Sequence, residues 1–237
     1  MTNYRIERAI DLNDLSLKAS QMIASHISLT LKHSDRIQIA LPGGTTPSKT
    51  YKLLGQEDLP WDRVDLFLGD ERWVDFNDEA SNAGMIYRTL LAEKPGSACC
   101  FHPVPTVECS NPKDSAEGFS QLIRKLCLGE PPIFDLILLG LGDDGHTASL
   151  FPGSDSLKVT DSFATHTIAK GHDRITLTPP VLSAARKVIF LVSGASKQIA
   201  LKRLIDSSEP MSRTPARLVQ PKSEVLILAD KAASKLI

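Results

Sequence analysis

The chain has 237 residues, of which 42% are hydrophobic and 23% are charged, and its formal net charge is −1. A globular chain of this length buries roughly 70–75% of its unfolded surface, and we expect residues 1–237 to form a single domain. The near-zero net charge and the lack of a basic cluster exclude nucleic acid as the main partner, because phosphate backbones are bound through many Lys and Arg side chains.

The sequence carries no signal for a membrane. The amino-terminal segment lacks the apolar stretch of a secretory signal, and no run approaches the ~20 apolar residues that cross a bilayer. We therefore expect a cytoplasmic protein with no membrane partner. No CxxC pattern occurs, which favours reduced thiols over disulfides or a metal cluster at Cys99, Cys100, Cys109 and Cys127.

Strand and helix patterns alternate along most of the chain. The expected strands are residues 4–6 (an edge strand), 36–41, 64–68, 100–104, 133–139, 163–168, 174–178, 187–192 and 224–229. The expected helices are residues 12–31, 48–54, 81–91, 116–126, 193–205 and 231–237, with a helical turn through Ala185. Such alternation predicts right-handed crossovers and an α/β protein of three layers with a mostly parallel central sheet.

A glycine-rich turn follows the strand at 36–41. We expect Thr46 to cap the next helix and Pro47 to occupy its first position, so that backbone N–H groups and the helix dipole converge on one point. Such a point binds phosphate or carboxylate, although a turn without a ligand is the alternative. The spacing is not that of a nucleotide P-loop. The candidate ligands of an anion are Gly43, Gly44, Thr45 and Thr46.

The strand at 64–68 is followed by a predicted charged loop, Gly69 to Trp73. The guanidinium of Arg72 can bind phosphate through two parallel hydrogen bonds. Asp70 and Glu71 could hold Arg72 in place or act as a base. A surface cluster of ion pairs is the alternative.

The most informative segment runs from Ile133 to Gly153. Its first half reads as a strand buried on both faces, and its second half places Asp143, Asp144 and His146 in a glycine-rich turn. Ligands of an open α/β sheet bind beyond the carboxyl ends of the strands, which predicts a site at His146. A solvated turn and a divalent metal site are the alternatives.

Lys197 lies in the first turn of the helix that follows the strand at 187–192. A cation is unfavourable at that end of the helix dipole, so its presence indicates a nearby anion, unless it is simply solvated. Together the turns after the strands hold an amide cradle, an arginine, an Asp/His cluster and a lysine. This combination predicts a small phosphorylated metabolite, held by its phosphate while His146 acts on its other end.

The motifs then resemble those of the 6-phosphogluconolactonase family, whose wider group includes glucosamine-6-phosphate isomerase/deaminase. They are GGTTPSKTYKLL (43–54), WDRVDLFLGDERWV (61–74), SNAGMIYRTLL (81–91), FDLILLGLGDDGHTASLFPGS (134–154), RITLTPPVL (174–182) and VSGASKQIAL (192–201). The resemblance implies a modified Rossmann-like α/β/α fold without a metal or other cofactor. It also implies hydrolysis of 6-phospho-D-glucono-1,5-lactone in the oxidative pentose phosphate pathway. The closing segment, 217–230, departs from the family's usual ending, which leaves the packing of the last strand open.

The two activities of this group differ in the residue five positions after the histidine. The deaminase pattern has a Glu there, and this chain has Phe151, so the ring-opening relay lacks a member. A deaminase and a non-enzymatic sugar-phosphate sensor are the alternatives to a lactonase.

For lactone hydrolysis we expect neutral His146 to deprotonate water, with Asp144, or alternatively Asp143, fixing its tautomer. Backbone amides of the glycine-rich turn would face the developing oxyanion. The expected partner is a sugar-phosphate lactone, and the oligomeric state is monomer or small homo-oligomer. The 6-phosphate would be bound by the turn at 43–46 and by Arg72, Arg174 and Lys197. Asp70 is a further expected substrate-binding residue.

Overall fold

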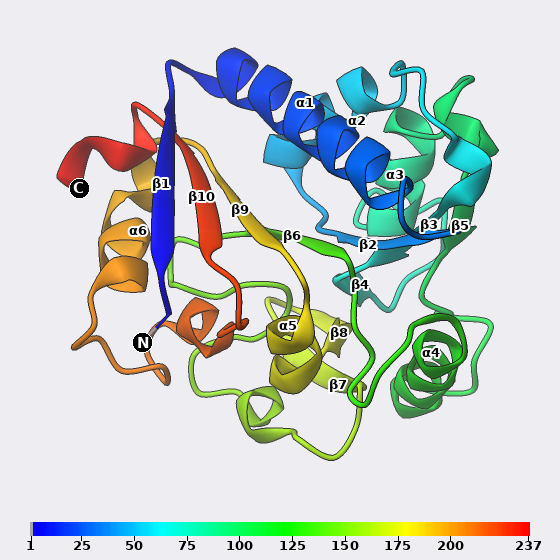
Figure 1. Ribbon diagram of the computed structural model, residues 1–237. Helices are drawn as coiled ribbons and strands as arrows, with labels where there is room; N and C mark the ends of the chain where they lie inside the picture. Colours follow the sequence, from blue (N-terminus) through cyan, green and yellow to red (C-terminus); the bar gives the residue numbers. More distant parts are fainter. Residues whose placement is uncertain (1) are drawn as a thin grey trace.

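The computed structural model describes residues 2–237, and its centre is one parallel sheet in the order β1-β10-β9-β6-β2-β3-β5 (Figure 1). Its strands are β1 (Tyr4–Ala9), β2 (Ile37–Leu41), β3 (Val64–Leu68), β5 (Cys100–His102), β6 (Leu136–Gly140), β9 (Val188–Val192) and β10 (Val225–Asp230). All the pairings between neighbouring strands in this sheet are parallel. The predicted α/β class with a mostly parallel sheet is confirmed.

Burial explains why these segments are strands. Every residue of β3, β9 and β10 is buried, as expected for central parallel strands covered on both faces. β1 is only partly buried and lies at one edge of the sheet, as predicted. The last strand, whose packing the sequence left open, pairs with β1 on one side and with β9 on the other.

Helices cover both faces of the sheet (Figure 1). α1, α2 and α3 lie on one face, and α5 and α6 lie on the opposite side together with α4. Their bounds are α1 (Leu12–Thr30), α2 (Thr45–Leu54), α3 (Asn82–Thr89), α4 (Pro112–Leu126), α5 (Pro179–Ala184) and α6 (Gln198–Ile205). In the described residues 2–237, no helix is both long and apolar enough to span a membrane. The predicted three-layer arrangement is confirmed.

Two predicted helix boundaries are wrong. α2 begins at Thr45 with Gly44 as its N-cap, so Thr46 lies inside the helix and does not cap it. Gly44 has φ +103°, a conformation that glycine adopts far more readily than threonine, and this fixes the earlier start. Pro47 is tolerated as the third helical residue because N–H groups in the first turn have no partner within the helix. Residues 231–237, predicted as a helix, contain a 3-10 turn at Ala233–Leu236 instead.

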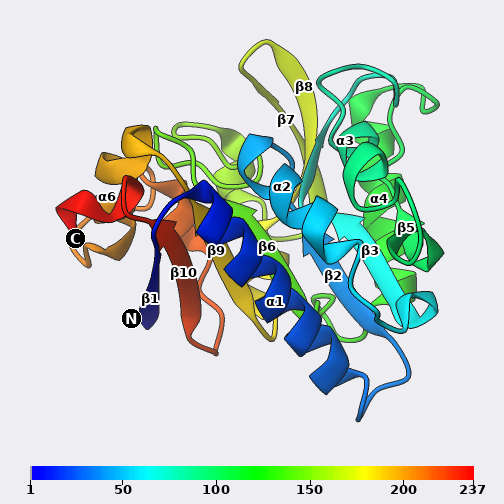
Figure 2. The same ribbon diagram turned by 90° about the horizontal axis from the view of Figure 1, so that it is seen from above.

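A second, antiparallel sheet was not predicted. It has the order β4-β8-β7, with β4 at Asp70–Arg72, β7 at Ala164–Ala169 and β8 at His172–Leu177. The charged segment predicted as a loop is therefore partly a strand. Figure 2 shows the β7–β8 hairpin extending from the body of the molecule. This small sheet brings Arg72 opposite Arg174 at the carboxyl end of β3.

Candidate active site

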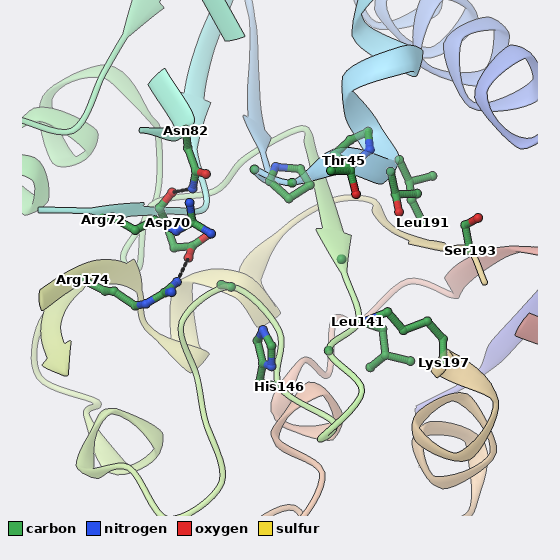
Figure 3. A pocket seen from close by; sticks show the side chains of 18 residues that line it. Thr45, Asp70, Arg72, Asn82, Leu141, His146, Arg174, Leu191, Ser193 and Lys197 are labelled. Atoms are coloured by element: carbon green, nitrogen blue, oxygen red, sulfur yellow. Dashed lines mark hydrogen bonds and ion pairs between the residues drawn. The ribbon is translucent and has the colours of Figure 1, made fainter. Parts of the chain in front are cut away.

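A cleft of about 250 Å³ opens at the carboxyl ends of the central strands (Figure 3). Its walls come from the turn after β2, from β4 and β8, from the turn after β6 and from the segment after β9. Nine of the ten predicted site residues line it, namely Gly43, Gly44, Thr45, Thr46, Asp70, Arg72, His146, Arg174 and Lys197. The tenth, Asp144, stands behind His146. The sequence-based reasoning missed Asn82 and Ser193, which also line the cleft.

The imidazole of His146 is held by Asp144. The Nδ1 of His146 lies 2.5 Å from Oδ1 of Asp144, and the same oxygen accepts the backbone N–H of His146 at 3.0 Å. Asp143 does not take this role, because its Oδ1 accepts the backbone N–H of Asp144. A Cβ on Gly142 would lie 2.0 Å from His146 Nδ1, so only glycine leaves room for the ring. Of the two aspartates, Asp144 is the partner of the histidine.

The surroundings of His146 favour its neutral form. Burial lowers the pKa of His146 below its ordinary value, and the hydrogen bond that His146 donates to Asp144 offsets only part of this effect. For Asp144, burial is the largest single effect and raises the pKa, but the two hydrogen bonds from His146 together with the charges of His146 and Lys170 outweigh it, so the pKa is lowered. A neutral imidazole with Nδ1–H bonded to a carboxylate carries its lone pair on Nε2. That atom is the candidate base.

Phe151 packs against His146, the candidate base. Its ring stacks on the imidazole of His146 with centroids 4.1 Å apart and planes at 27°. The guanidinium of Arg174 lies 5.4 Å from the centroid of the same ring. The position that carries a Glu in the deaminase pattern is therefore filled here by an apolar ring that shields the imidazole from water.

Asp70 pairs with Arg174 and not with Arg72, contrary to one of the sequence-based expectations. Its Oδ2 lies 3.8 Å from Nη1 of Arg174, and both side chains are buried. Ser149 donates a hydrogen bond of 2.5 Å to the same carboxylate oxygen. Arg72 instead donates from Nη1 to the carbonyl of Ala80, and its buried Nε has no hydrogen-bond partner among the described residues.

Glu71 is a structural cap and neither a base nor a clamp for Arg72's side chain. Its carboxylate accepts backbone N–H groups of Asn82 and Ala83 at the start of α3, and the N–H of Arg72. Burial raises the pKa of Glu71 to about 7, against the opposing effect of these N–H donors. The cap fixes the start of α3 and so places Asn82 in the cleft. A Cβ on Gly43 would lie 1.8 Å from Oδ1 of Asn82.

The cations enter the cleft from two directions. Figure 3 shows Arg72 and Arg174 on one side of His146, and Lys197 on the other. Lys197 forms no ion pair with any residue that the structure describes, whereas Arg174 forms an ion pair with Asp70. No side chain within residues 2–237 caps α2, so the first amides of that helix remain open to a ligand. Lys197 and the start of α2 are the strongest candidates for binding an anion.

The amides of the turn around His146 are already used. The N–H of Gly142 bonds to the carbonyl of His146, and that of Gly145 bonds to Gly142. The N–H groups of Asp144 and His146 bond to the side chains of Asp143 and Asp144. These four amides are therefore not free to stabilise an oxyanion in the observed geometry. Within the described part of the chain, no group of three or more His, Cys, Asp and Glu side chains could hold a metal ion.

This fold and cleft define a class of protein: a three-layer α/β protein with an open helix N-terminus, unpaired positive charge and a carboxylate-held histidine at the strand ends. Residues 10–228 match the family model described as glucosamine-6-phosphate isomerases/6-phosphogluconolactonase. The chain belongs to this family, which confirms the resemblance seen in the sequence motifs.

Relatives and solved structures agree with this assignment. The chain is 38% identical to a 6-phosphogluconolactonase of Nostoc sp., covering 96% of both chains. It is 36% identical to one of Synechocystis sp., covering 98% of this chain and 97% of the relative. The structure of 6-phosphogluconolactonase from Trypanosoma brucei superposes with a TM-score of 0.87 at 28% identity, covering 99% of both chains. A monomeric glucosamine-6-phosphate deaminase, at 20% identity and a TM-score of 0.82, shares the fold.

Proposed function

We propose that this protein is a 6-phosphogluconolactonase, which hydrolyses 6-phospho-D-glucono-1,5-lactone to 6-phospho-D-gluconate in the oxidative pentose phosphate pathway. The observation that carries the proposal is the pair formed by His146 and Asp144, which faces a cleft that also holds Lys197 and the open start of α2. The relatives from Nostoc and Synechocystis, similar over nearly their whole length, support the same activity.

The mechanism follows from the neutral imidazole. Nε2 of His146 takes a proton from water as the water oxygen attacks the lactone carbonyl, and Asp144 stabilises the imidazolium that forms. The tetrahedral oxygen needs a hydrogen-bond donor or positive charge, and four amides of the turn around His146 already have partners. Arg174, which shares the ring of Phe151 with His146, is the candidate for this role. The ring oxygen then leaves as the alcohol, with the proton returned by His146.

The phosphate is proposed to bind at the other end of the cleft. The first amides of α2, in the turn Gly43 to Thr46, and the ammonium of Lys197 would contact it directly. Arg72 adds positive charge from the opposite wall, whereas Arg174, which the sequence suggested for the phosphate, is proposed for the oxyanion instead. Binding energy from a phosphate far from the carbonyl then orients the reacting carbon against His146.

The activity is tested with freshly prepared lactone in an assay coupled to 6-phosphogluconate dehydrogenase, corrected for spontaneous opening of the lactone. We expect the protein to accelerate lactone opening. We expect no ammonia release from glucosamine 6-phosphate, because Phe151 replaces the Glu of the deaminase pattern. Ammonia release without lactonase activity would reverse the assignment, and neither activity would favour a sensor.

Replacing Lys197 with Gln is expected to raise KM for the phosphorylated lactone by roughly 10- to 100-fold, the usual effect of losing one charged hydrogen bond. Arg72→Gln is expected to have a smaller effect because Arg72 already donates to Ala80. The control is unphosphorylated glucono-1,5-lactone, whose hydrolysis should be the same for the wild type and the two variants. Equal losses on both lactones would contradict a phosphate-binding role.

The pH dependence follows from the shifted pKa of His146. Only the neutral imidazole accepts a proton, and burial lowers its pKa below the ordinary value of 6.5. The midpoint of the decline of kcat/KM on the acidic side is therefore expected below pH 6.5, so that activity persists into mildly acidic solution. Initial rates between pH 5 and 8 measure it, and a limb above pH 6.5 would show that His146 is not the titrating base.

A further inference from the structure

The tip of the β7–β8 hairpin carries an unusual residue. Lys170 and Gly171 form its two-residue turn, with φ of +50° and +79°. This is the pattern of a type I′ turn, which strongly favours Asn-Gly. A lysine in the left-handed region is strained, and such strain is often retained where the side chain has a function.

The side chain of Lys170 extends back from the tip toward Asp144, the partner of His146. Its Nζ lies 3.5 Å from Oδ2 of Asp144 and 4.0 Å from Oδ1 of Asp143. It also lies 5.4 Å from the ring centroid of Phe151, the ring that stacks on the imidazole. Asp144 is thus bound through both oxygens, with Oδ1 on His146 and Oδ2 facing Lys170.

Lys170 lies behind the histidine and not in the cleft. Among the described residues that line the cleft, Lys170 is absent, whereas His146 is present. Its side chain is 51% exposed, which weakens its electrostatic effect by solvent screening. Any influence on the reaction must therefore pass through Asp144 and Phe151 and not through contact with substrate.

Several charges face the imidazole of His146. Asp144 comes from its own turn, Asp70 comes from β4, and Lys170 comes from the hairpin tip. Arg174 of β8 acts across Phe151. Asp143 contacts Lys170 from the same turn as His146. Among these charged residues, Lys170 is the one with a positive φ, a backbone conformation that disfavours lysine.

We propose that Lys170 is a positioning residue for lactone hydrolysis: it holds Oδ2 of Asp144, which keeps His146 oriented, and its positive charge keeps the imidazole neutral. This inference rests on the proposed function of the cleft. Loss of the cation leaves the charge of Asp144 uncompensated at Oδ2 and removes a repulsion of the imidazolium, so protonation of His146 becomes easier. Removing the charge of Lys170 should therefore change the protonation of His146 and leave substrate binding unchanged.

The test compares Lys170→Asn with the wild type. Asn-Gly fits the type I′ turn, so we expect a melting temperature equal to or above that of the wild type. KM should change less than twofold. The acidic limb of kcat/KM should move up by roughly half a pH unit, which lowers the rate below the limb about threefold. A shift of this size is the range expected for a half-exposed pair. Lys170→Arg should restore the wild-type limb.

NMR titration of the His146 imidazole provides a readout that does not depend on activity. Its resonances are assigned by their loss in His146→Gln, and its pKa should rise in Lys170→Asn by the same amount as the limb. Lys158→Asn is the matched control, because it removes the same charge from an exposed pair with Asp155 at 3.8 Å. It should leave both readouts unchanged.

The outcomes separate the two proposals. A wild-type limb and a wild-type titration in Lys170→Asn would overturn the role of Lys170, as would an equal shift in Lys158→Asn. If the wild type does not hydrolyse the lactone, the proposed function fails. The titration of His146 then still decides whether Lys170 acts on the histidine.

Discussion

Replacing His146 with Gln is expected to reduce kcat for the phosphorylated lactone by roughly 10²- to 10⁴-fold, the usual contribution of a general base. The amide cannot accept the proton of the attacking water. KM should change little, because the groups proposed to bind the phosphate lie elsewhere in the cleft. Steady-state rates, corrected for spontaneous opening, measure the loss.

A second histidine offers a matched control. His166 pairs with Asp173 at 2.6 Å, and its side chain is 19% exposed, against 20% for His146. It is not among the described residues that line the cleft. His166→Gln should therefore keep the wild-type rate. A full rate in His146→Gln, or equal losses in the two variants, would remove His146 from the mechanism.

Gly142→Ala is expected to lower kcat by roughly 10²-fold, the effect of displacing a reacting group by about 1 Å. The added Cβ would lie 2.0 Å from Nδ1 and 2.2 Å from Cε1 of His146, and 2.7 Å from Oδ1 of Asp144. These distances are too short for non-bonded atoms, so the imidazole and the carboxylate must both move. The two groups that form the proposed base are displaced by one methyl group.

Gly118→Ala is the control for this substitution. Gly118 lies within α4, and its added Cβ would meet only Cγ of Pro105 at an ordinary 3.7 Å. Alanine has a higher helix propensity than glycine, so this variant should be slightly more stable than the wild type, and it should remain active. Thermal melting and kcat are measured for both variants. A Gly142→Ala protein with wild-type kcat would show that the contact between His146 and Asp144 is not needed in the observed geometry.

Much of the fold was predictable because burial on both faces leaves a clear trace in sequence. β3 and β9 are short apolar runs bounded by turn residues, and they appear where the pattern places them. The start of α2 was not predictable from capping preferences alone. It depends on Gly44 adopting φ +103°, and a glycine pair permits several turn geometries.

The small antiparallel sheet explains most of what the sequence did not reveal about the site. β4 has only three residues, too few for an alternating pattern, so Asp70 and Arg72 read as a charged loop. The pairing of Asp70 with Arg174 depends on how β4 meets β8, which no local pattern encodes. Asn82 could have been found only by recognising that Glu71 caps α3.

The histidine site was better defined by sequence than the anion site. Asp144 is two positions from His146, so a local turn alone can join them, and the structure has this contact. Lys197, Arg72 and the start of α2 come from segments far apart in the chain. Their positions after predicted strands indicated a shared cleft but not the two directions from which the cations enter it (Figure 3).

The central claim is that one cleft binds a phosphate at one end and presents a basic imidazole at the other. A crystal structure with 6-phospho-D-gluconate tests it most directly. The account predicts the phosphate on the first amides of α2 and on Lys197, with an oxygen of the C1 carboxylate about 3 Å from Nε2 of His146, within hydrogen-bond reach. A product bound with its C1 carboxylate away from His146, or outside this cleft, would contradict the account.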